Sequence, residues 1–342
     1  MGETSVKYDL MSGNDALAII DAYRGEIHDL TTVEELDREF PYYTQELGLT
    51  GTWLAHLEDN DSGTFKWRGA MAGAVQLARE GATRLIVPSA GNHARGAVWA
   101  AKQLGMPITT VVPNSAPEKK RTKLRELWDS HLLHIKTVGE TFDESLEWAR
   151  ADPSGILLHP YGREVIPGQG TAVDDILRLK PDTETIVLPV GGGGLAAGVL
   201  RRLDELGRLD IQVIGAEAEG SNSMSKSLRT GEITAADKPN QRYGGSAVQK
   251  LSQAALDIAS NSPNFQVTTV PEADVDELID WYESGRQELI RHMTPHLEPT
   301  SLVAVAALKQ RLHTGETVVL GTGQNDALRP VRQLLRWRRI AV

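Results

Sequence analysis

The stretch Ser62-Gly63-Thr64-Phe65-Lys66-Trp67-Arg68-Gly69-Ala70 places one lysine between two aromatic residues, in the first turn of a predicted helix. One of residues 62–64 can serve as the N-cap of that helix. The positive end of the helix dipole disfavours a cation, and flanking rings remove water from the ammonium group. Both effects lower the pKa of Lys66 and make it a better nucleophile toward an aldehyde. A surface lysine whose alkyl chain lies over Phe65 is the structural alternative.

Short apolar runs alternate with amphipathic segments of helical length on both sides of this stretch. The predicted strands are 53–58, 84–88, 108–112, 132–137, 156–159, 185–189, 212–216, 266–270 and 317–320. The predicted helices are the one at Lys66, then 92–104, 117–128, 142–151, 168–179, 195–206, 275–291 and 300–312. This alternation predicts βαβ units, parallel sheets and the α/β fold class. We expect residues 1–40 to form an N-terminal arm with helical patches at 14–23 and 32–39, and residues 219–245 to be a polar interruption.

Composition and charge exclude several classes of protein. The chain has 342 residues, a formal net charge of -10 and no cysteine. The acidic balance argues against nucleic acid or an anionic membrane as a partner, because either needs a basic face. Without cysteine there is no disulfide, thiolate metal site or cysteine nucleophile. The sequence has no run of about 18 apolar residues and no apolar signal core, so we expect no membrane span and a cytoplasmic location.

A second motif, Gly191-Gly192-Gly193-Gly194-Leu195, follows a predicted strand and opens a helix. Successive glycines let backbone N–H groups converge, and the helix N-terminus adds positive potential, so the motif predicts a site for a phosphate. A dinucleotide-binding loop is a competing interpretation, with Glu217 at the distance of its acidic residue, although that fingerprint normally uses spaced glycines. A purely structural glycine turn is a further alternative.

Two more turns follow predicted strands. In Ser89-Ala90-Gly91-Asn92-His93, small residues expose backbone N–H groups that suit a carboxylate, and the Asn92 amide suits the rim of a cofactor ring. The simpler alternative makes Asn92 the N-cap of a helix that begins at Ala94. In Gly321-Thr322-Gly323-Gln324-Asn325-Asp326, a hydroxyl follows the last strand, at the edge where parallel sheets collect ligands, although ordinary turn chemistry also fits.

Several motifs in register carry a resemblance to a known family. They are residues 62–70, 89–96, 168–171, 191–194, 298–300 and 322–325. Their order and spacing resemble the pyridoxal-phosphate enzymes of fold type II, and within them the threonine/serine dehydratases, over about residues 41 to 326. The resemblance implies the tryptophan synthase β-like architecture of two parallel-sheet domains. The large cofactor-binding domain would comprise residues 1–77 and 166–342, with 1–40 as its arm, and the small domain residues 78–165.

The resemblance also implies a role for each motif. Lys66 would form the Schiff base with pyridoxal phosphate and later act as the base on Cα, and Phe65 would support one face of the ring. The phosphate would bind at Gly191, Gly192, Gly193, Gly194 and Leu195. Asn92 would donate to the phenolic oxygen, and Thr322 would hydrogen-bond the pyridine nitrogen. The substrate carboxylate would bind at Ser89, Ala90, Gly91, Asn92 and His93.

The function that follows from the resemblance is β-elimination of water from a threonine- or serine-like 3-hydroxy amino acid, which gives a 2-oxo acid and ammonia. A hydroxyl opposite the pyridine nitrogen is a poor proton source, and the resulting shallow electron sink favours elimination over transamination. The alternative within the same chemistry is β-replacement, in which a nucleophile captures the aminoacrylate. A non-catalytic binding protein that keeps the cofactor pocket is the alternative from another class. Which amino acid is the substrate is not decided by the sequence.

Four departures from the family pattern refine this expectation. Ala90 stands where racemases carry a serine as second base, which argues against racemization. Ser223 stands where an aspartate is usual near Glu217, and the histidines show no zinc spacing, so no metal is expected. His56 stands where relatives place a lysine, and no role is assigned to it. The chain ends soon after Thr322, so no C-terminal regulatory domain is expected; a homodimer is expected by resemblance alone.

Overall fold

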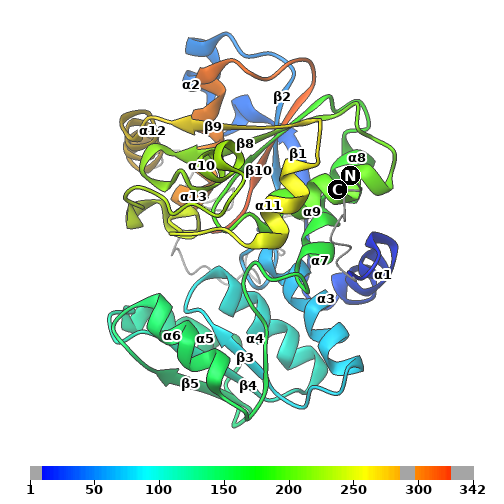
Figure 1. Cartoon of the computed structure of the whole chain (residues 1–342). Helices are drawn as coiled ribbons and strands as arrows, with labels where there is room; N and C mark the ends of the chain where they lie inside the picture. Colours follow the sequence, from blue (N-terminus) through cyan, green and yellow to red (C-terminus); the bar gives the residue numbers. More distant parts are fainter. Residues whose placement is uncertain (1–9, 286–296, 325–342) are drawn as a thin grey trace, which may run out of the picture.

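The computed structural model describes residues 10–285 and 297–324, and within them two sheets lie in two parts of the molecule (Figure 1). The larger part holds a six-stranded sheet in the order β1-β2-β10-β7-β8-β9. Its strands are β1 (Thr32–Glu35), β2 (Thr52–His56), β10 (Thr317–Gly321), β7 (Thr185–Pro189), β8 (Gln212–Ala218) and β9 (Phe265–Val270). Only β1 pairs antiparallel; the other neighbours within this sheet are parallel. The expected α/β class with parallel sheets is confirmed.

The smaller part holds a four-stranded parallel sheet in the order β5-β4-β3-β6. Its strands are β3 (Leu85–Pro88), β4 (Ile108–Val112), β5 (Leu133–Thr137) and β6 (Ile156–Leu157). All four lie inside the range 78–165 predicted for the small domain, which supports that division. The division of the whole chain at residues 77 and 165 stays our proposal.

Helices cover both sheets. They are α1 (Gly13–Arg24), α2 (Pro41–Leu47), α3 (Lys66–Arg79), α4 (Asn92–Leu104), α5 (Glu118–Leu127), α6 (Phe142–Ala151), α7 (Ile166–Gly170), α8 (Ala172–Leu179), α9 (Gly194–Glu205), α10 (Ser223–Thr230), α11 (Gln253–Ser260), α12 (Glu272–Gly285) and α13 (Pro299–Ala306). On β7, Ile186 and Leu188 face a core with α8, α9 and α11, whereas Val187 faces a core with α12 and α13. Burial on both faces is what parallel strands require.

Three expectations about local structure need correction, and a fourth falls partly outside the described residues. Residues 32–39, predicted as helical, form strand β1 and a short 3-10 helix, Leu36–Arg38, because β1 pairs with β2 along the edge of the sheet. The single helix predicted over 168–179 is two helices, α7 and α8. The polar interruption contains helix α10, and α11 was not predicted. The helix predicted to reach Arg291 is described only to Gly285, and the rest lies outside the described residues.

A buried network of charges joins the N-terminal segment to the body of the protein. Arg68 is fully buried, and its Nη2 lies 2.8 Å from Asp29 and 2.7 Å from Asp175. Arg24 of α1 pairs with the same two carboxylates, at 2.6 and 2.9 Å. Although burial opposes ionisation, Arg68 and Arg24 lower the pKa of Asp175. The N-terminal residues from α1 onward are therefore part of the folded body.

Candidate active site

Three neighbouring strands of the large sheet end at the candidate site. β10 lies between β2 and β7, and all three are parallel, so their carboxyl ends meet at one edge. The turn before Lys66 follows β2, the glycine motif follows β7, and Thr322 follows β10. Backbone hydrogen bonds join the turn before Lys66 to the segment at Thr322. The Phe65 N–H donates to the Thr322 carbonyl (3.0 Å), and the Gln324 N–H donates to the Gly63 carbonyl (3.0 Å).

Lys66 is the first residue of α3, as the sequence predicts, but the N-cap is Phe65 rather than one of residues 62–64. The Thr64 hydroxyl accepts a hydrogen bond from the Lys66 N–H (3.2 Å), so it still satisfies one donor of the first turn. The Lys66 Nζ donates to the Pro160 carbonyl (3.1 Å) and lies 5.0 Å from the centre of the Phe65 ring. Burial lowers the pKa of Lys66 to about 8, against an opposing effect of Glu298.

This lowered pKa has a consequence that can be measured on the protein without cofactor. Half of the Lys66 amine is neutral near pH 8, whereas an ordinary lysine reaches that point near pH 10.5. We expect reductive methylation of Lys66 by formaldehyde and cyanoborohydride to rise with pH, with a midpoint near pH 8. Peptide mass spectrometry gives the rate at Lys66, with exposed lysines as internal reference. A Lys66 profile that follows those exposed lysines would contradict the prediction.

The glycine motif forms a cradle that side chains would fill. A Cβ on Gly191 would lie 2.6 Å from the Gly245 carbonyl oxygen, and a Cβ on Gly192 would lie 2.3 Å from the Tyr161 ring. Gly193 has a φ of 83° and is the N-cap of α9, with no side chain capping the helix. The N–H groups at this helix start are therefore available to an anion. Leu195 is buried in the core, so only its backbone can serve the phosphate.

Substitution of Gly193 by Ala is expected to weaken binding of pyridoxal phosphate by about 10-fold. A left-handed φ costs an alanine about 1 to 2 kcal/mol, and a backbone that relaxes to relieve this strain moves the N–H groups of the cradle away from the phosphate. The new Cβ would also lie 2.6 Å from the Ala255 Cβ. Equilibrium dialysis of the cofactor measures the change. Gly207→Ala is the matched control, since Gly207 follows the other end of α9 with a φ of 66° and open space around it. The control should keep its affinity and lose only stability.

The turn from β3 to α4 places its residues at the same site. Helix α4 begins at Asn92 with Gly91 as N-cap, so the interpretation of Asn92 as the N-cap of a helix from Ala94 is wrong. The Ser89 hydroxyl accepts from the Gly91 N–H (3.2 Å), and Ala90 lines the cavity beside them. His93 is buried with Nε2 2.9 Å from the Leu158 carbonyl. Burial lowers the pKa of His93 to about 3, so its ring is neutral.

Glu298 is a site residue to which the sequence gave no role, although it lies in one of the motifs of the resemblance. The Asn92 Nδ2 donates to both of its carboxylate oxygens, at 2.7 and 2.8 Å. Burial raises the pKa of Glu298, while Asn92, Arg95 and Lys66 oppose that rise. Pro160 was also missed, because a backbone carbonyl that binds Lys66 from 94 positions away leaves no sequence signal.

Thr322 is buried, and its hydroxyl lies 3.2 Å from that of Ser301 at the start of α13. The same Ser301 oxygen accepts the Thr322 N–H (2.9 Å). The Thr322 side chain lines the cavity, so a second partner for its hydroxyl would come from a ligand. Asn325 and Asp326, part of the predicted motif, lie outside the described residues.

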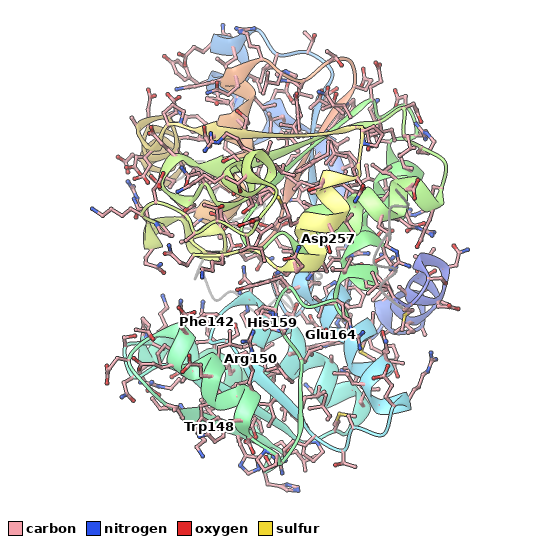
Figure 2. The ribbon with its side chains drawn as sticks, in the orientation of Figure 1. Phe142, Trp148, Arg150, His159, Glu164 and Asp257 are labelled. Carbon is pink, nitrogen blue, oxygen red and sulfur yellow. The ribbon has the colours of Figure 1, made fainter. Side chains whose placement is uncertain are left out.

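A cavity of about 1710 Å³ brings these segments together. It exceeds the volume of about 300 to 1,000 Å³ typical of small-molecule sites, so it has room for a cofactor and a substrate. Phe142 and His159 line it from the smaller part, and Figure 2 shows both at the side that faces the larger part. The residues fit pyridoxal phosphate, because a buried amine, an open glycine cradle and a hydroxyl line one space. The individual roles given to these residues stay proposals.

Glu217 holds the start of helix α10 in place. Its two carboxylate oxygens accept the N–H groups of Met224 (2.6 Å) and Ser225 (2.9 Å) at the start of α10. Burial raises its pKa to about 7. Within residues 10–285 and 297–324, no group of three or more acidic or histidine side chains is arranged to hold a metal. No helix in these ranges is both long and apolar enough to cross a membrane.

Known proteins resemble this chain in fold and in sequence. A threonine deaminase of T.th. superposes with a TM-score of 0.73 and 27% identity, over 94% of this chain and 100% of that one. Maize serine racemase gives a TM-score of 0.78 at 21% identity, over 97% and 98%, which supports the fold alone. The L-threonine ammonia-lyase of Thermotoga maritima is 34% identical over 230 residues, 66% of this chain and 56% of that protein.

A further relative and a family model match most of the chain. The biosynthetic L-threonine dehydratase of Mycobacterium tuberculosis is 32% identical over 279 residues, 78% of this chain and 62% of that protein. This chain thus spans a little over half the length of these two curated relatives. The model of the family "Pyridoxal-phosphate dependent enzyme" matches residues 31–323, nearly the whole described chain. The chain therefore belongs to the pyridoxal-phosphate dependent enzyme family.

Proposed function

We propose that this protein catalyses the β-elimination of water from a threonine- or serine-like 3-hydroxy amino acid, with release of a 2-oxo acid and ammonia. The observation that carries the proposal is the buried Lys66 amine, with its pKa lowered to about 8, in one cavity with the glycine cradle and a hydroxyl at Thr322. The names of the relatives, which are ammonia-lyases and dehydratases of threonine or serine, support the same reaction.

Each residue contributes a defined part. Bound pyridoxal phosphate supplies an electron sink for the bond between Cα and its proton. Lys66 holds the cofactor covalently and then serves as the base that takes the Cα proton, which its lowered pKa favours. The N–H groups of residues 191–195 bind the phosphate. The Thr322 hydroxyl is a poor proton source for the pyridine nitrogen of the cofactor. The cofactor therefore withdraws electrons less strongly, which favours loss of the β-hydroxyl over transamination.

The turn at residues 89–93 binds and orients the substrate in this proposal. Its exposed N–H groups hold the carboxylate, and Gly91 keeps that surface open. The Asn92 Nδ2 would donate to the phenolic oxygen of the cofactor, either in place of its hydrogen bond to Glu298 or together with it. Ala90 offers no acid on the opposite face of Cα, so inversion at Cα is disfavoured.

The test is an assay of the cofactor-loaded protein with L-threonine and L-serine, separately, for 2-oxo acid and ammonia in equal amounts. Stoichiometric release from either amino acid supports the proposal. Consumption of the amino acid only when a thiol or amine is added, with a new amino acid as product, would replace it by β-replacement. No turnover and no visible absorbance band after loading with pyridoxal phosphate would leave the binding-protein alternative.

A homodimer and a cytoplasmic location belong to the proposal as well. Both come from the sequence and its resemblance, since the structure contains a single chain. Size-exclusion chromatography with light scattering tests the first: a mass of twice 37.3 kDa is expected. Fractionation of cells that express the protein tests the second.

A further inference from the structure

A buried group of titratable side chains lies behind the candidate site, at the carboxyl end of β2. We call it the His56 cluster, and it consists of His56, Glu34, Glu39 and Glu58. The His56 Nδ1 lies 2.9 Å from Glu58 Oε1, and its Nε2 lies 3.1 Å from Glu34 Oε1 and 4.0 Å from Glu39 Oε1. The side chains of His56, Glu39 and Glu58 are at most 1% exposed. Neither the catalytic proposal nor the sequence gives these residues a role.

The cluster holds His56 as a cation. Burial opposes a charged imidazole, but Glu58, Glu34 and Glu39 raise the pKa of His56 well above its ordinary value. A raised pKa means that the charge is present at low and neutral pH and is lost only when the pH rises through that higher value. Arg38 lies 3.2 Å from Glu34 at the exposed side of the cluster. His56 is therefore the buried counter-ion for Glu58 and Glu39.

Glu58 links the cluster to the end of β10. Its second carboxylate oxygen lies where a side chain on Gly321 would begin, since a Cβ there would be 2.7 Å from Glu58 Oε2. The Glu58 carbonyl also accepts from the Gln324 Nε2 (3.2 Å). Gly321 precedes Thr322, so the position of Glu58 constrains the loop that carries the Thr322 hydroxyl. The negative charge of Glu58 is also one cause of the raised pKa of Glu298.

Tyr282 of α12 is a second link. Its hydroxyl donates to Glu39 Oε2 (3.3 Å) and accepts the N–H of Leu297 (3.1 Å), the residue before Glu298. Two contiguous chains of contacts therefore run from His56 to the site. One passes through Glu58 to Gly321, and the other passes through Glu39 and Tyr282 to the backbone N–H of Leu297, next to Glu298.

We propose that His56 is a positioning residue that, by holding the carboxylates of Glu58 and Glu39 in place, sets the charge on Glu298 and thereby the reactivity of Lys66. Without His56, Glu58 is a buried carboxylate that lacks its counter-ion and takes up a proton. A neutral Glu58 no longer repels the charge on Glu298, so Glu298 ionises more readily. An ionised Glu298 stabilises the Lys66 ammonium, so the pKa of Lys66 rises. The charged and titratable groups that face Glu298 in this argument are Glu58, Arg95 and Lys66, with the Asn92 amide.

The experiment is the pH dependence of reductive methylation of Lys66 in the cofactor-free protein. His56→Gln is expected to move the midpoint upward by about 0.5 to 1 pH unit. Glu58→Gln removes the same charge and should move it in the same direction. The double variant should show no further shift, because both changes act through one group. His56→Lys keeps a cation and should restore the wild-type midpoint.

His28→Gln is the matched control, since His28 pairs with Asp61 at 2.7 Å on the exposed surface. It should leave the midpoint unchanged. Folded His56→Gln and Glu58→Gln proteins that keep the wild-type midpoint would overturn the proposal. If His56→Gln does not fold, the methylation midpoints of Glu58→Gln and His56→Lys decide the proposal: the first should be shifted upward and the second should match the wild type.

This inference concerns the reactivity of Lys66 on which the proposed function rests, but the two fail separately. A protein that releases no 2-oxo acid refutes the proposed function and leaves the methylation result intact. In an active protein, the pH profile of kcat gives a second readout, because kcat reports the groups that titrate once substrate is bound, when Lys66 serves as the base. In that profile, His56→Gln and Glu58→Gln should shift the pH midpoint of the same limb by equal amounts, and His56→Lys should leave that midpoint unchanged. A purely structural role would lower the melting temperature and leave the limb in place.

Discussion

Replacement of Lys66 by Ala is expected to lower kcat for 2-oxo acid release from L-threonine or L-serine by at least about 10⁴-fold, the scale of losing a nucleophile that also acts as base. The structure gives the reason: within the described residues, the ammonium of Lys66 lies in the cavity with a single hydrogen bond, to a backbone carbonyl. Oxo acid and ammonia assays measure the rate. Borohydride reduction followed by peptide mass spectrometry should find the cofactor on Lys66 in the wild type.

Lys102→Ala is a suitable control, since Lys102 lies in the last turn of α4 and donates to the Leu127 carbonyl at the surface. It should keep the wild-type rate. A Lys66→Ala protein that turns over substrate at the wild-type rate would end the assignment of Lys66 and, with it, the proposed reaction.

Replacement of Arg68 by Met is expected to lower the free energy of unfolding by about 3 to 5 kcal/mol, because it leaves buried carboxylates short of a counter-ion. Arg68 is fully buried and pairs with both Asp29 and Asp175. Without it, Arg24 would be the counter-ion left for Asp29, and Asp175 would keep Arg24 and the exposed Arg178. Urea unfolding followed by tryptophan fluorescence measures the change through its midpoint.

Arg178→Ala tests whether burial causes that loss. Arg178 also binds Asp175, at 3.1 Å, but its side chain is 61% exposed. An exposed ion pair contributes at most about 1 kcal/mol, so this variant should unfold close to the wild type. Equal losses in the two variants would show that the buried position of Arg68 has no special effect.

The alternation of apolar runs and helices was enough to predict most of the fold. Nine strands were expected, and β1 was the strand that the pattern missed. Its sequence, Thr-Val-Glu-Glu, is short and polar, and pairing with β2 decides its structure rather than its own propensity. Helix α10 was missed because it is a short helix in a polar region, whereas α11 was missed although its eight residues are largely apolar. The break between α7 and α8 lies at Thr171, whose N–H and hydroxyl both donate to the Gly168 carbonyl, at 3.3 and 2.7 Å.

The site was predictable where chemistry is local in sequence. The glycine motif and the lysine turn each carry their chemistry within a few consecutive residues, and the cavity contains both. The partners of Lys66 and Asn92 were not predictable, because Pro160 and Glu298 reach them across the fold. His56 shows the same limit. Its neighbour Glu58 is two positions away, but Glu34 and Glu39 meet it only in the folded chain.

The central position of β10 also governs how the molecule can assemble. β10 pairs with β2, about 265 residues earlier, and with β7, about 132 residues earlier. Such distant pairings close large loops of chain, which makes them late and slow events in folding. The four-stranded sheet uses only residues 85–157, so it can form while the ribosome is still adding later strands. The cradle, the lysine and Thr322 come together only when β10 inserts, so the site is complete only after β10 has been synthesised and paired.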